Sequence, residues 1–324
     1  KETGKISHEG SACGIMDAFL DAISKFIAAD LRTATPLLLA GLGIVFSERA
    51  GVVNIGVEGM MLVGALAGVL GSYFFGSVWM GTLVAMICSG IIGLLFAYLS
   101  VSVKANQIVI GAAINILGLG LTTSFARTVF GVNTAPPKID SFSRIQIPVL
   151  SDIPYLGTAF FQSNALVFIA VLLVPIASFV MFRTDVGLKV RAVGEHPKAC
   201  DTVGINVYLV RYLTIVFSGI MSGVAGAYVS MGLLSFFTEN MIAGRGFMAL
   251  AAVIFGKYRP AGVLVAALVF GAAEALQFRL QAAGTSIPFQ FLLMLPYVLT
   301  ILALAGFVGK ARKPAASARP YEKE

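Results

Sequence analysis

Long apolar runs separated by short polar clusters dominate the hydropathy pattern of this chain. A helix needs about 20 apolar residues to cross the roughly 30 Å hydrocarbon core of a bilayer. The pattern therefore predicts an all-α polytopic membrane protein with about nine spans, eight to ten if boundaries shift. The nine candidate runs are approximately Thr33–Ser47, Val52–Phe75, Val78–Val101, Gln107–Ala126, Asn164–Phe182, Tyr212–Thr238, Gly246–Gly256, Pro260–Phe278 and Ile287–Val308.

Two of these runs are too short to span a bilayer alone. The first has about 15 residues and the seventh about 11, so broken or re-entrant helices compete with misplaced boundaries as the explanation. Irregular backbone at membrane depth is tolerated only where it is buried in protein or lines a wet cavity. Asn54, followed by Gly56 and Gly59, is typical of an unwound turn at the start of the second run.

The segment before the first run has a different period. Residues 16–32 predict an amphipathic helix that lies in the membrane interface. Residues 1–15 have no such period and no signal-peptide core, so they are interpreted as an upstream extension or a remnant of cloning. The apolar positions of the amphipathic segment are Met16, Phe19, Leu20, Ile23, Phe26, Ile27 and Leu31.

Composition supports a membrane protein and excludes several other classes of protein. Hydrophobic residues make up 58% of the 324 residues and charged residues only 12%, and the mean hydropathy is +0.90, which excludes a soluble enzyme. Three cysteines and two scattered histidines are too few for a disulfide framework or a multi-ligand zinc site. The sequence has no phosphate-binding loop and no hydrolase motif, so no ATP hydrolysis or other catalysis is expected on this chain.

The charges predict how the chain crosses the membrane. The net charge of +7 is interpreted as a topology signal and not as nucleic-acid binding, because the basic residues lie between apolar runs. The positive-inside rule places the linker 183–211 and the basic tail 309–324 in the cytoplasm. The N-terminus and the proline-rich loop 131–163 are then external.

The order of runs predicts an internal repeat within the transmembrane domain 33–308. Four runs precede a linking span at residues 164–182 and four follow it, so the second set would be inverted relative to the first. Small residues on single helix faces predict close helix packing and not catalysis. They are Gly64, Gly68, Gly71, Gly219, Gly223 and Gly226.

Polar residues inside apolar runs are the candidate substrate-path residues, because buried polar groups in a membrane are costly. For Glu58 and Glu274 two interpretations stay open: a polar wall or proton carrier along a path, and a hydrogen-bonded carboxyl that fixes helix packing. Arg245 lies beside the seventh run. The path candidates are Asn54, Glu58, Asn115, Glu239, Asn240, Glu274 and Gln277.

The cytoplasmic linker mixes both charge signs. Pro197 fits the first turn of a short helix that ends at Gly204, with Ala199, Cys200 and Val203 as its apolar face. From these residues alone, a docking helix for a protein partner and an ordinary solvated loop are equally good interpretations. His196 by itself is not expected to be a ligand or a catalyst.

Four sequence blocks follow one another along the chain: Gly51–Met61 (GVVNIGVEGMM), Ala105–Asn115 (ANQIVIGAAIN), Ala192–Ile205 (AVGEHPKACDTVGI) and Thr238–Gly256 (TENMIAGRGFMALAAVIFG). In this order they resemble the permease subunits of bacterial ABC importers of the branched-chain amino acid, ribose and simple-sugar type, and most closely the nucleoside branch. The resemblance covers about residues 16–308. His196 and Cys200 stand where asparagine and alanine are more usual.

The resemblance implies a nucleoside importer in a bacterial cytoplasmic membrane. A second related permease, separate ABC ATPase subunits that bind ATP and Mg²⁺, and an external substrate-binding lipoprotein would be its partners, with no cofactor on this chain. An importer of simple sugars or another small polar solute, or an ion-coupled transporter, are the alternatives. The resemblance assigns ATPase coupling to Glu195, His196, Pro197, Lys198, Asp201, Gly204 and Ile205.

Overall fold

A computed structural model describes residues 6–131, 138–146, 157, 160–284, 288–306 and 312–322. These residues are almost entirely helical, with one two-stranded antiparallel pair. The elements are α1 (Ile6–Arg49), α2 (Val57–Phe75), α3 (Val78–Ala97), a π-helical turn η1 (Tyr98–Ser102), α4 (Gln107–Phe130), β1 (Arg144–Gln146), β2 (Gln162–Asn164), α6 (Ala165–Arg183), α7 (Asp185–Glu195), α8 (Pro197–Thr202), α9 (Val207–Tyr228), a second π-helical turn η2 (Val229–Leu234), α10 (Arg245–Phe255), α11 (Pro260–Ala282) and α12 (Phe289–Gly306).

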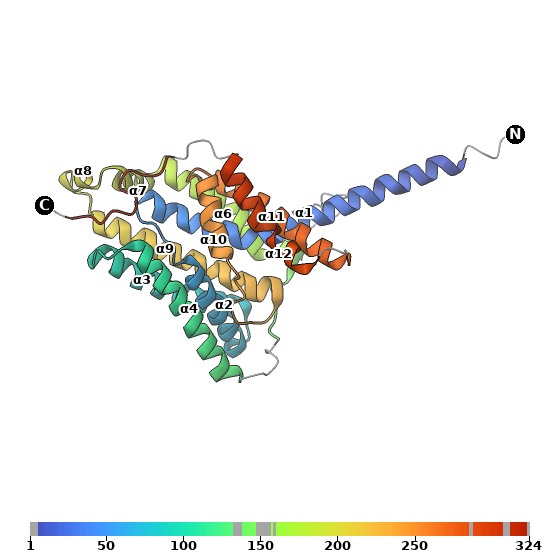
Figure 1. Cartoon of the computed structure of the whole chain (residues 1–324), viewed down its shortest axis with the longest axis horizontal. Coiled ribbons are helices and arrows are strands. Elements are labelled where there is room, and N and C mark those ends of the chain that lie inside the picture. Colours follow the sequence, from blue (N-terminus) through green and yellow to red (C-terminus); the bar gives the residue numbers. More distant parts are fainter. Residues whose placement is uncertain are drawn as a thin grey trace.

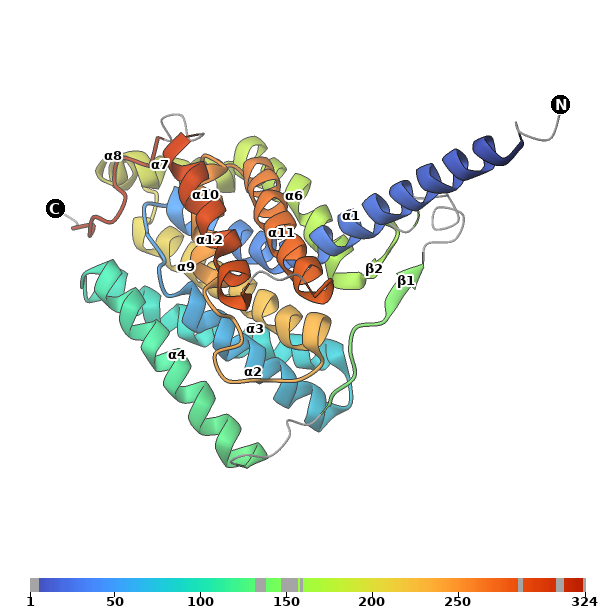
Figure 2. The same cartoon turned by 45° about the vertical axis from the view of Figure 1, so that its right-hand side comes forward.

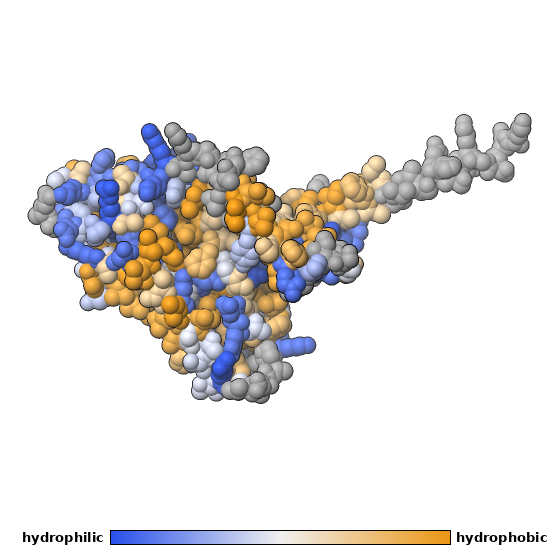
Figure 3. Space-filling view, in the orientation of Figure 1, coloured by the Kyte–Doolittle hydropathy of each residue, from blue (hydrophilic) through white to orange (hydrophobic). Residues whose placement is uncertain are grey.

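Two helices, α1 and α9, form the centre of the body. They pack against each other, with α2 and α3 against α9 and with α6, α10 and α11 against α1. Both views show α2, α3 and α4 on one side of this pair and α6, α11 and α12 on the other (Figures 1 and 2). Hydrophobic residues cover the middle of the body, and hydrophilic residues gather at the end that carries α7 and α8 (Figure 3).

Seven described helices are long and apolar enough to cross a membrane: α1 from Met16, α2, α3 with η1, α4, α6, α9 with η2, and α11. The polytopic helical prediction is therefore confirmed. Seven candidate spans lie among the described residues, and the nine predicted spans stay a prediction. The predicted seventh and ninth runs correspond to α10 and α12, which are not among the seven. The short seventh run is confirmed, because α10 has 11 residues. The inverted repeat stays a prediction.

The predicted amphipathic segment and the predicted short first run are continuous in the structure, and the interfacial position of residues 16–32 stays a prediction. One helix, α1, runs for 44 residues through both segments, and its N-terminal part extends from the body (Figure 1). Charged and hydroxyl side chains do not interrupt it: Arg32 Nε donates to Ala28 O (3.0 Å) and Thr33 Oγ1 to Gly271 O (2.9 Å). These residues satisfy their polar groups locally or against α11, so the helix continues through a cluster that resembles a boundary in sequence.

The predicted glycine packing is confirmed. A Cβ added to Gly64 would lie 2.5 Å from Gly223 O, and one added to Gly219 would lie 2.8 Å from Ser89 O. Close backbone approach of this kind is how small residues join transmembrane helices. The glycine faces therefore hold α2, α3 and α9 together at the centre of the body.

Several predicted regions fall partly outside the described residues. The predicted external loop 131–163 is described only at Gly131, residues 138–146, Gly157 and residues 160–163, which include β1 and part of β2. The interpretation of residues 1–15 is not tested. The tail is described over residues 312–322, where it packs against the body.

Candidate permeation and coupling sites

The unwound turn predicted at Asn54 is present, and α2 begins only at Val57. Asn54 is fully buried. Its Oδ1 accepts from Gly56 N (3.1 Å), and its Nδ2 donates to Ser218 Oγ (3.1 Å) on α9. An amide that accepts locally and donates across a helix contact fixes the turn between α1 and α2 against α9.

Side chains from α4 satisfy the backbone at the start of α2. Asn115 Oδ1 accepts from Gly59 N (2.8 Å), and Asn115 Nδ2 donates to Ile55 O (3.0 Å). Gln107 Oε1 accepts from Val53 N (2.9 Å). The first backbone N–H groups of a helix have no intrahelical partner, so these two amides replace the water that a membrane interior lacks.

Glu58 does the same for α10. Its Oε1 accepts from Gly244 N and its Oε2 from Gly246 N, both at 2.7 Å. Gly244 adopts a left-handed conformation (φ +86°) just before α10 begins. A buried carboxylate at a helix N-terminus is stabilised by the exposed N–H groups and by the helix dipole. Glu58 therefore anchors the broken segment 235–244 to α2.

Two further helices hold this broken segment. Arg245 forms an ion pair with Glu274 of α11 through its Nε (3.0 Å) and Nη2, and both side chains are largely buried. Arg245 Nη1 also donates to Met241 O (3.0 Å), and Tyr297 of α12 donates to Ala243 O (2.6 Å). Residues 241–246 are thus fixed by α2, α11 and α12 together.

The remaining path candidates lie around the same segment or near it. Glu239 is half exposed and accepts two hydrogen bonds from Arg127 of α4, at 2.7 and 2.9 Å. This guanidinium holds the pKa of Glu239 below its usual range. Asn240 is exposed, in a left-handed turn (φ +56°). Gln277 is buried on α11, three residues after Glu274.

The structure therefore brings most candidates together around the starts of α2 and α10, but with distinct contacts. Asn54, Glu58, Asn115 and Glu274 hold backbone or side-chain partners, as does the half-exposed Glu239, whereas Asn240 is exposed. The sequence analysis did not identify Arg127, Ser218 or Tyr297 as partners. Arg127 had a detectable signal, a cation in the last turn of an apolar run, while a serine or tyrosine in such a run gives none.

The predicted linker helix is present as α8, with Pro197 at its first position and Gly204 in a left-handed turn (φ +82°) after its end. The preceding residues form a second amphipathic helix, α7, which the sequence analysis left as loop. A groove of about 480 Å³ lies between the two helices. Val203 lines it and is 73% exposed, so the pair presents an apolar, open surface.

All seven coupling candidates lie in or beside α7 and α8. Glu195 Oε2 accepts from Ala315 N (3.3 Å) of the tail, and His196 joins the two helices through its backbone. Lys198 is exposed on α8. Asp201 O accepts from Gly204 N (3.0 Å), and Ile205 N donates to Cys200 O (2.9 Å).

The tail crosses this end of the body. Ala316 N donates to Gly194 O (2.9 Å) and Ala318 N to Gly51 O (3.2 Å). Arg211, which is 1% exposed, donates from Nη1 to Arg319 O (3.0 Å). The Tyr321 ring packs edge-on against Tyr208 with centroids 5.4 Å apart. The tail thus joins the end of α7, the turn after α1 and the start of α9.

Further basic residues in turns lie at this end of the body. Arg49 Nε donates to Tyr258 O (2.9 Å), which brings the end of α1 to the turn that carries Lys257 and Arg259. Lys104 pairs with Glu322 of the tail (3.2 Å). The grouping is what one cytoplasmic face requires.

Comparison with known proteins is consistent with this architecture. Residues 26–304 match the family described as branched-chain amino acid transport system / permease component. The guanosine ABC transporter permease protein NupQ of Bacillus subtilis (strain 168) is 43% identical, over 93% of this chain and 97% of its own length. The nucleoside ABC transporter permease protein NupC of Lactococcus lactis subsp. cremoris (strain MG1363) is 37% identical, over 94% and 98%.

A third relative differs in the solute it is named for. TsgC13 of Haloferax volcanii, whose name assigns it provisionally to glucose as an ABC transporter permease, is 41% identical over 78% of this chain and 77% of its own length. All three relatives are permease proteins, so the expectation of a transporter component and not an enzyme is confirmed. With a family match over most of its length and multiple apolar helices, this chain is a multi-pass membrane protein that belongs to the branched-chain amino acid transport system permease family.

Proposed function

We propose that this chain forms part of the translocation path of an ABC importer for nucleosides in a bacterial cytoplasmic membrane. The observation that carries the proposal is its 43% identity to a guanosine permease over almost the full length of both chains. ATP and Mg²⁺ would bind separate ATPase subunits, since this chain has no phosphate-binding loop. A second related permease and an external substrate-binding lipoprotein complete the importer, without nucleic acid.

The broken segments support a path near the starts of α2 and α10. Asn54, Glu58, Asn115 and Glu274 satisfy the irregular backbone or its ion pair, so their role in the proposal is to hold the path open and polar. Glu239 and Asn240 are exposed and offer a carboxylate and an amide to ribose hydroxyls or base edges. Gln277 on α11 provides a further amide near the Arg245–Glu274 pair.

The α7–α8 pair supports ATPase docking at the tail end of the body. The α8 helix lies between α7, which follows α6, and α9, which packs at the centre of the body. Movement of a docked ATPase would therefore reach α9 of the central pair directly along the chain. It would reach α1 through α7 and α6, because α6 packs against α1. In this orientation the tail is cytoplasmic, and the start of α1 is external.

Uptake into vesicles tests the proposal. Vesicles containing this chain, its companion subunits and the binding protein would be supplied with radiolabelled guanosine, uridine or glucose, with and without ATP inside. We expect ATP-dependent guanosine or uridine uptake. ATP-dependent glucose uptake would favour the sugar importer that the 41% identical relative supports, and uptake driven by a proton gradient without any ATPase would contradict the ABC mechanism.

A substitution on α8 tests docking separately. Val203→Asp places a charge on an apolar side chain that is 73% exposed, so we expect loss of ATPase co-purification and at least a tenfold fall in ATP-driven uptake. The matched control is Val103→Asp. Val103 is also exposed (53%) and lies at the same end of the body, because the next residue, Lys104, contacts the tail, but Val103 is far from α8 in sequence. Equal ATPase recovery with both variants would exclude α8 as the docking element.

A further inference from the structure

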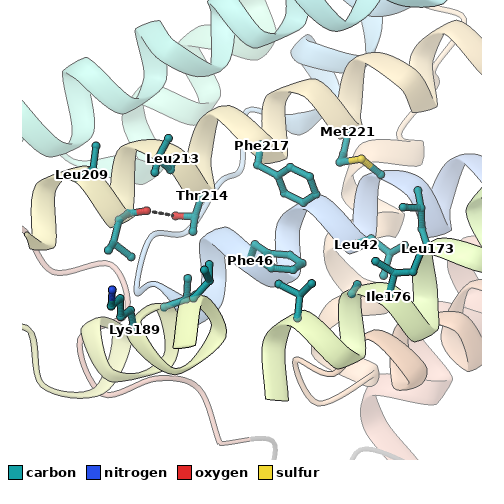
Figure 4. A pocket seen from close by; sticks show the side chains of 15 residues that line it. Leu42, Phe46, Leu173, Ile176, Lys189, Leu209, Leu213, Thr214, Phe217 and Met221 are labelled. Carbon is teal, nitrogen blue, oxygen red and sulfur yellow. Dashed lines mark hydrogen bonds between the residues drawn. The ribbon is translucent and has the colours of Figure 1, made fainter. Parts of the chain in front are cut away.

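An apolar groove between α1, α6, α7 and α9 has no role in the proposed transport cycle. Its volume is about 530 Å³. Leu42 and Phe46 of α1 form its floor, with α6 on one side and α9 on the other (Figure 4). Leu213 lines it and is 61% exposed, so the groove is open along its side. In a membrane, that opening faces the lipid.

The groove has the depth of one bilayer leaflet. Its lining on α9 extends from Leu209 to Met221, which corresponds to about 18 Å at 1.5 Å per residue. Half of the roughly 30 Å hydrocarbon core is about 15 Å. An extended acyl chain from one leaflet therefore matches the groove in length and in polarity.

A cation closes one end of the groove. Lys189 of α7 lines this end, with its ammonium group beside the α9 wall (Figure 4). Thr214, the other polar lining residue, already donates its hydroxyl to the carbonyl groups of Val210 and Arg211 (3.0 Å each). Among the residues that the structure describes, no hydrogen bond or ion pair uses the Lys189 ammonium. Lys189 also lines the α7–α8 groove, as does Asp185 one turn earlier, but Asp185 does not line this one.

We propose that this groove is a binding site for an anionic phospholipid, with an acyl chain along α6 and α9 and the phosphate beside Lys189. An apolar channel one leaflet deep that ends at an ammonium group with no partner among the described residues is complementary to a molecule with an apolar chain and an anionic head. The lipid would then pack under α7, at the point where α7 leaves the membrane body, and would support the position of the α7–α8 pair.

Photolabelling in membranes tests the site directly. Membranes containing the full chain would be labelled with phosphatidylglycerol carrying a diazirine in one acyl chain, and in parallel with phosphatidylcholine carrying the same chain. Mass spectrometry would locate the adducts. We expect adducts concentrated on residues 173–180 and 209–221, with about fivefold more from phosphatidylglycerol, the preference that one lysine near an anionic head group provides.

Two variants separate the head-group and acyl-chain contacts. Lys189→Gln should reduce the phosphatidylglycerol preference to about onefold, while Lys257→Gln, the same charge change on an exposed turn outside the groove, should not. Leu213→Trp should fill the groove and remove the adducts, whereas Leu172→Trp should not, because Leu172 is equally exposed (61%) but does not line the groove.

Three outcomes would overturn the proposal. Adducts spread evenly over the exposed helix faces would show ordinary boundary lipid. A preference unchanged by Lys189→Gln would remove the head-group contact. Protection of residues 173–180 and 209–221 from both lipids would show that a protein partner covers the groove. Because Lys189 and Leu213 are exposed, misfolding is a minor risk, and recovery of each variant in the membrane fraction would be compared with its control.

Discussion

Single buried polar side chains determine how this chain accommodates broken helices in a membrane. Glu58 uses both carboxylate oxygens for backbone N–H groups at the start of α10, and Asn54 and Asn115 serve the start of α2. In the hydrocarbon core an unsatisfied backbone group costs several kcal/mol. These residues therefore stabilise the discontinuities that a permeation path requires, whether or not they touch the solute.

The substitution Glu58→Gln should expose this role. Glutamine has one carbonyl oxygen, so only one of the N–H groups of Gly244 and Gly246 keeps an acceptor, and the amide NH₂ would face the other. We expect a loss of about 2 kcal/mol in stability, typical of a charge-assisted hydrogen bond to a buried donor. We also expect reduced uptake by a complex that still assembles. A lower apparent melting temperature of the detergent-solubilised chain would measure the stability effect.

Glu239→Gln is the matched control for that experiment. Glu239 also accepts two hydrogen bonds, but the pair with Arg127 is half exposed, and exposed ion pairs contribute little to stability. Its melting temperature should remain close to that of the unsubstituted chain. Equal melting temperatures for both variants would show that Glu58 does not anchor α10.

The sequence indicated which polar side chains are buried better than it indicated their hydrogen-bond partners. Isolated polar residues in apolar runs indicated Asn54, Glu58, Asn115 and Glu274, because burial of such groups is costly. Their partners were not predictable. Glu58 and Gly244 are separated by 186 residues, and neither hydropathy nor spacing shows which helix lies opposite. The two interpretations left open for Glu58 and Glu274 differ in those partners, and the contacts favour packing as one role of both.

At the scale of elements, backbone contact between helices holds the centre of the body. The glycines of α9 lie against α2 and α3 without intervening side chains. Van der Waals contact and small residues drive helix association in lipid, since apolar burial gives little advantage there. The stability of the α1–α9 centre therefore depends on the absence of Cβ atoms at a few positions.

Gly226→Ala tests that dependence. A Cβ at Gly226 would overlap with Met61 O of α2, which is backbone and has no rotamer to adopt. We expect the helices to separate and stability to fall by about 2 kcal/mol, in the range of overpacked cores. Gly120→Ala in α4 is the control, because nothing lies within 4 Å of its added Cβ, and alanine favours a helix by about 1 kcal/mol over glycine. If both variants melt alike, the glycine face is not a tight contact.

Element boundaries were predicted well where local chemistry defines them. Pro197 and Gly204 define the limits of α8 by fixed φ and by left-handed conformation, and Asn54 marked the unwound turn before α2. The long helix α1 was not predicted. In sequence, the polar cluster Asp30, Arg32 and Thr33 is typical of a helix end. In the structure, Arg32 and Thr33 donate hydrogen bonds to carbonyl groups of α1 and α11, and the helix continues. Such compensation depends on tertiary contacts.

At the scale of the whole molecule, the tail connects parts of the chain that are far apart in sequence. Its backbone bonds reach Gly51 and Gly194, and it covers the buried guanidinium of Arg211. The charge of the tail predicts a cytoplasmic location, which stays a prediction. These contacts were not predictable, because residues 312–322 have no helical or strand period. The tail therefore makes the α1–α2 turn, α7 and α9 one unit beside the proposed docking surface.

Truncation after Lys313 tests whether this unit matters for coupling, and it keeps the basic residues Arg312 and Lys313 that support orientation. The truncated chain loses five hydrogen bonds to the rest of the chain. The bonds to Glu195 and Lys104 are exposed and contribute little, and the other three contribute roughly 1 kcal/mol each. Truncation also leaves Arg211 with no described hydrogen-bond acceptor. We expect about 3 kcal/mol lower stability. We also expect a larger fall in ATP-driven uptake than in ATPase co-purification, because α8 remains while the link that the tail makes between α7 and the α1–α2 turn is lost. Lys104→Gln, which removes only the exposed pair with Glu322, should behave like the unsubstituted chain. An unchanged melting temperature and unchanged uptake after truncation would show that the tail lies on this surface without connecting the α1–α2 turn, α7 and α9.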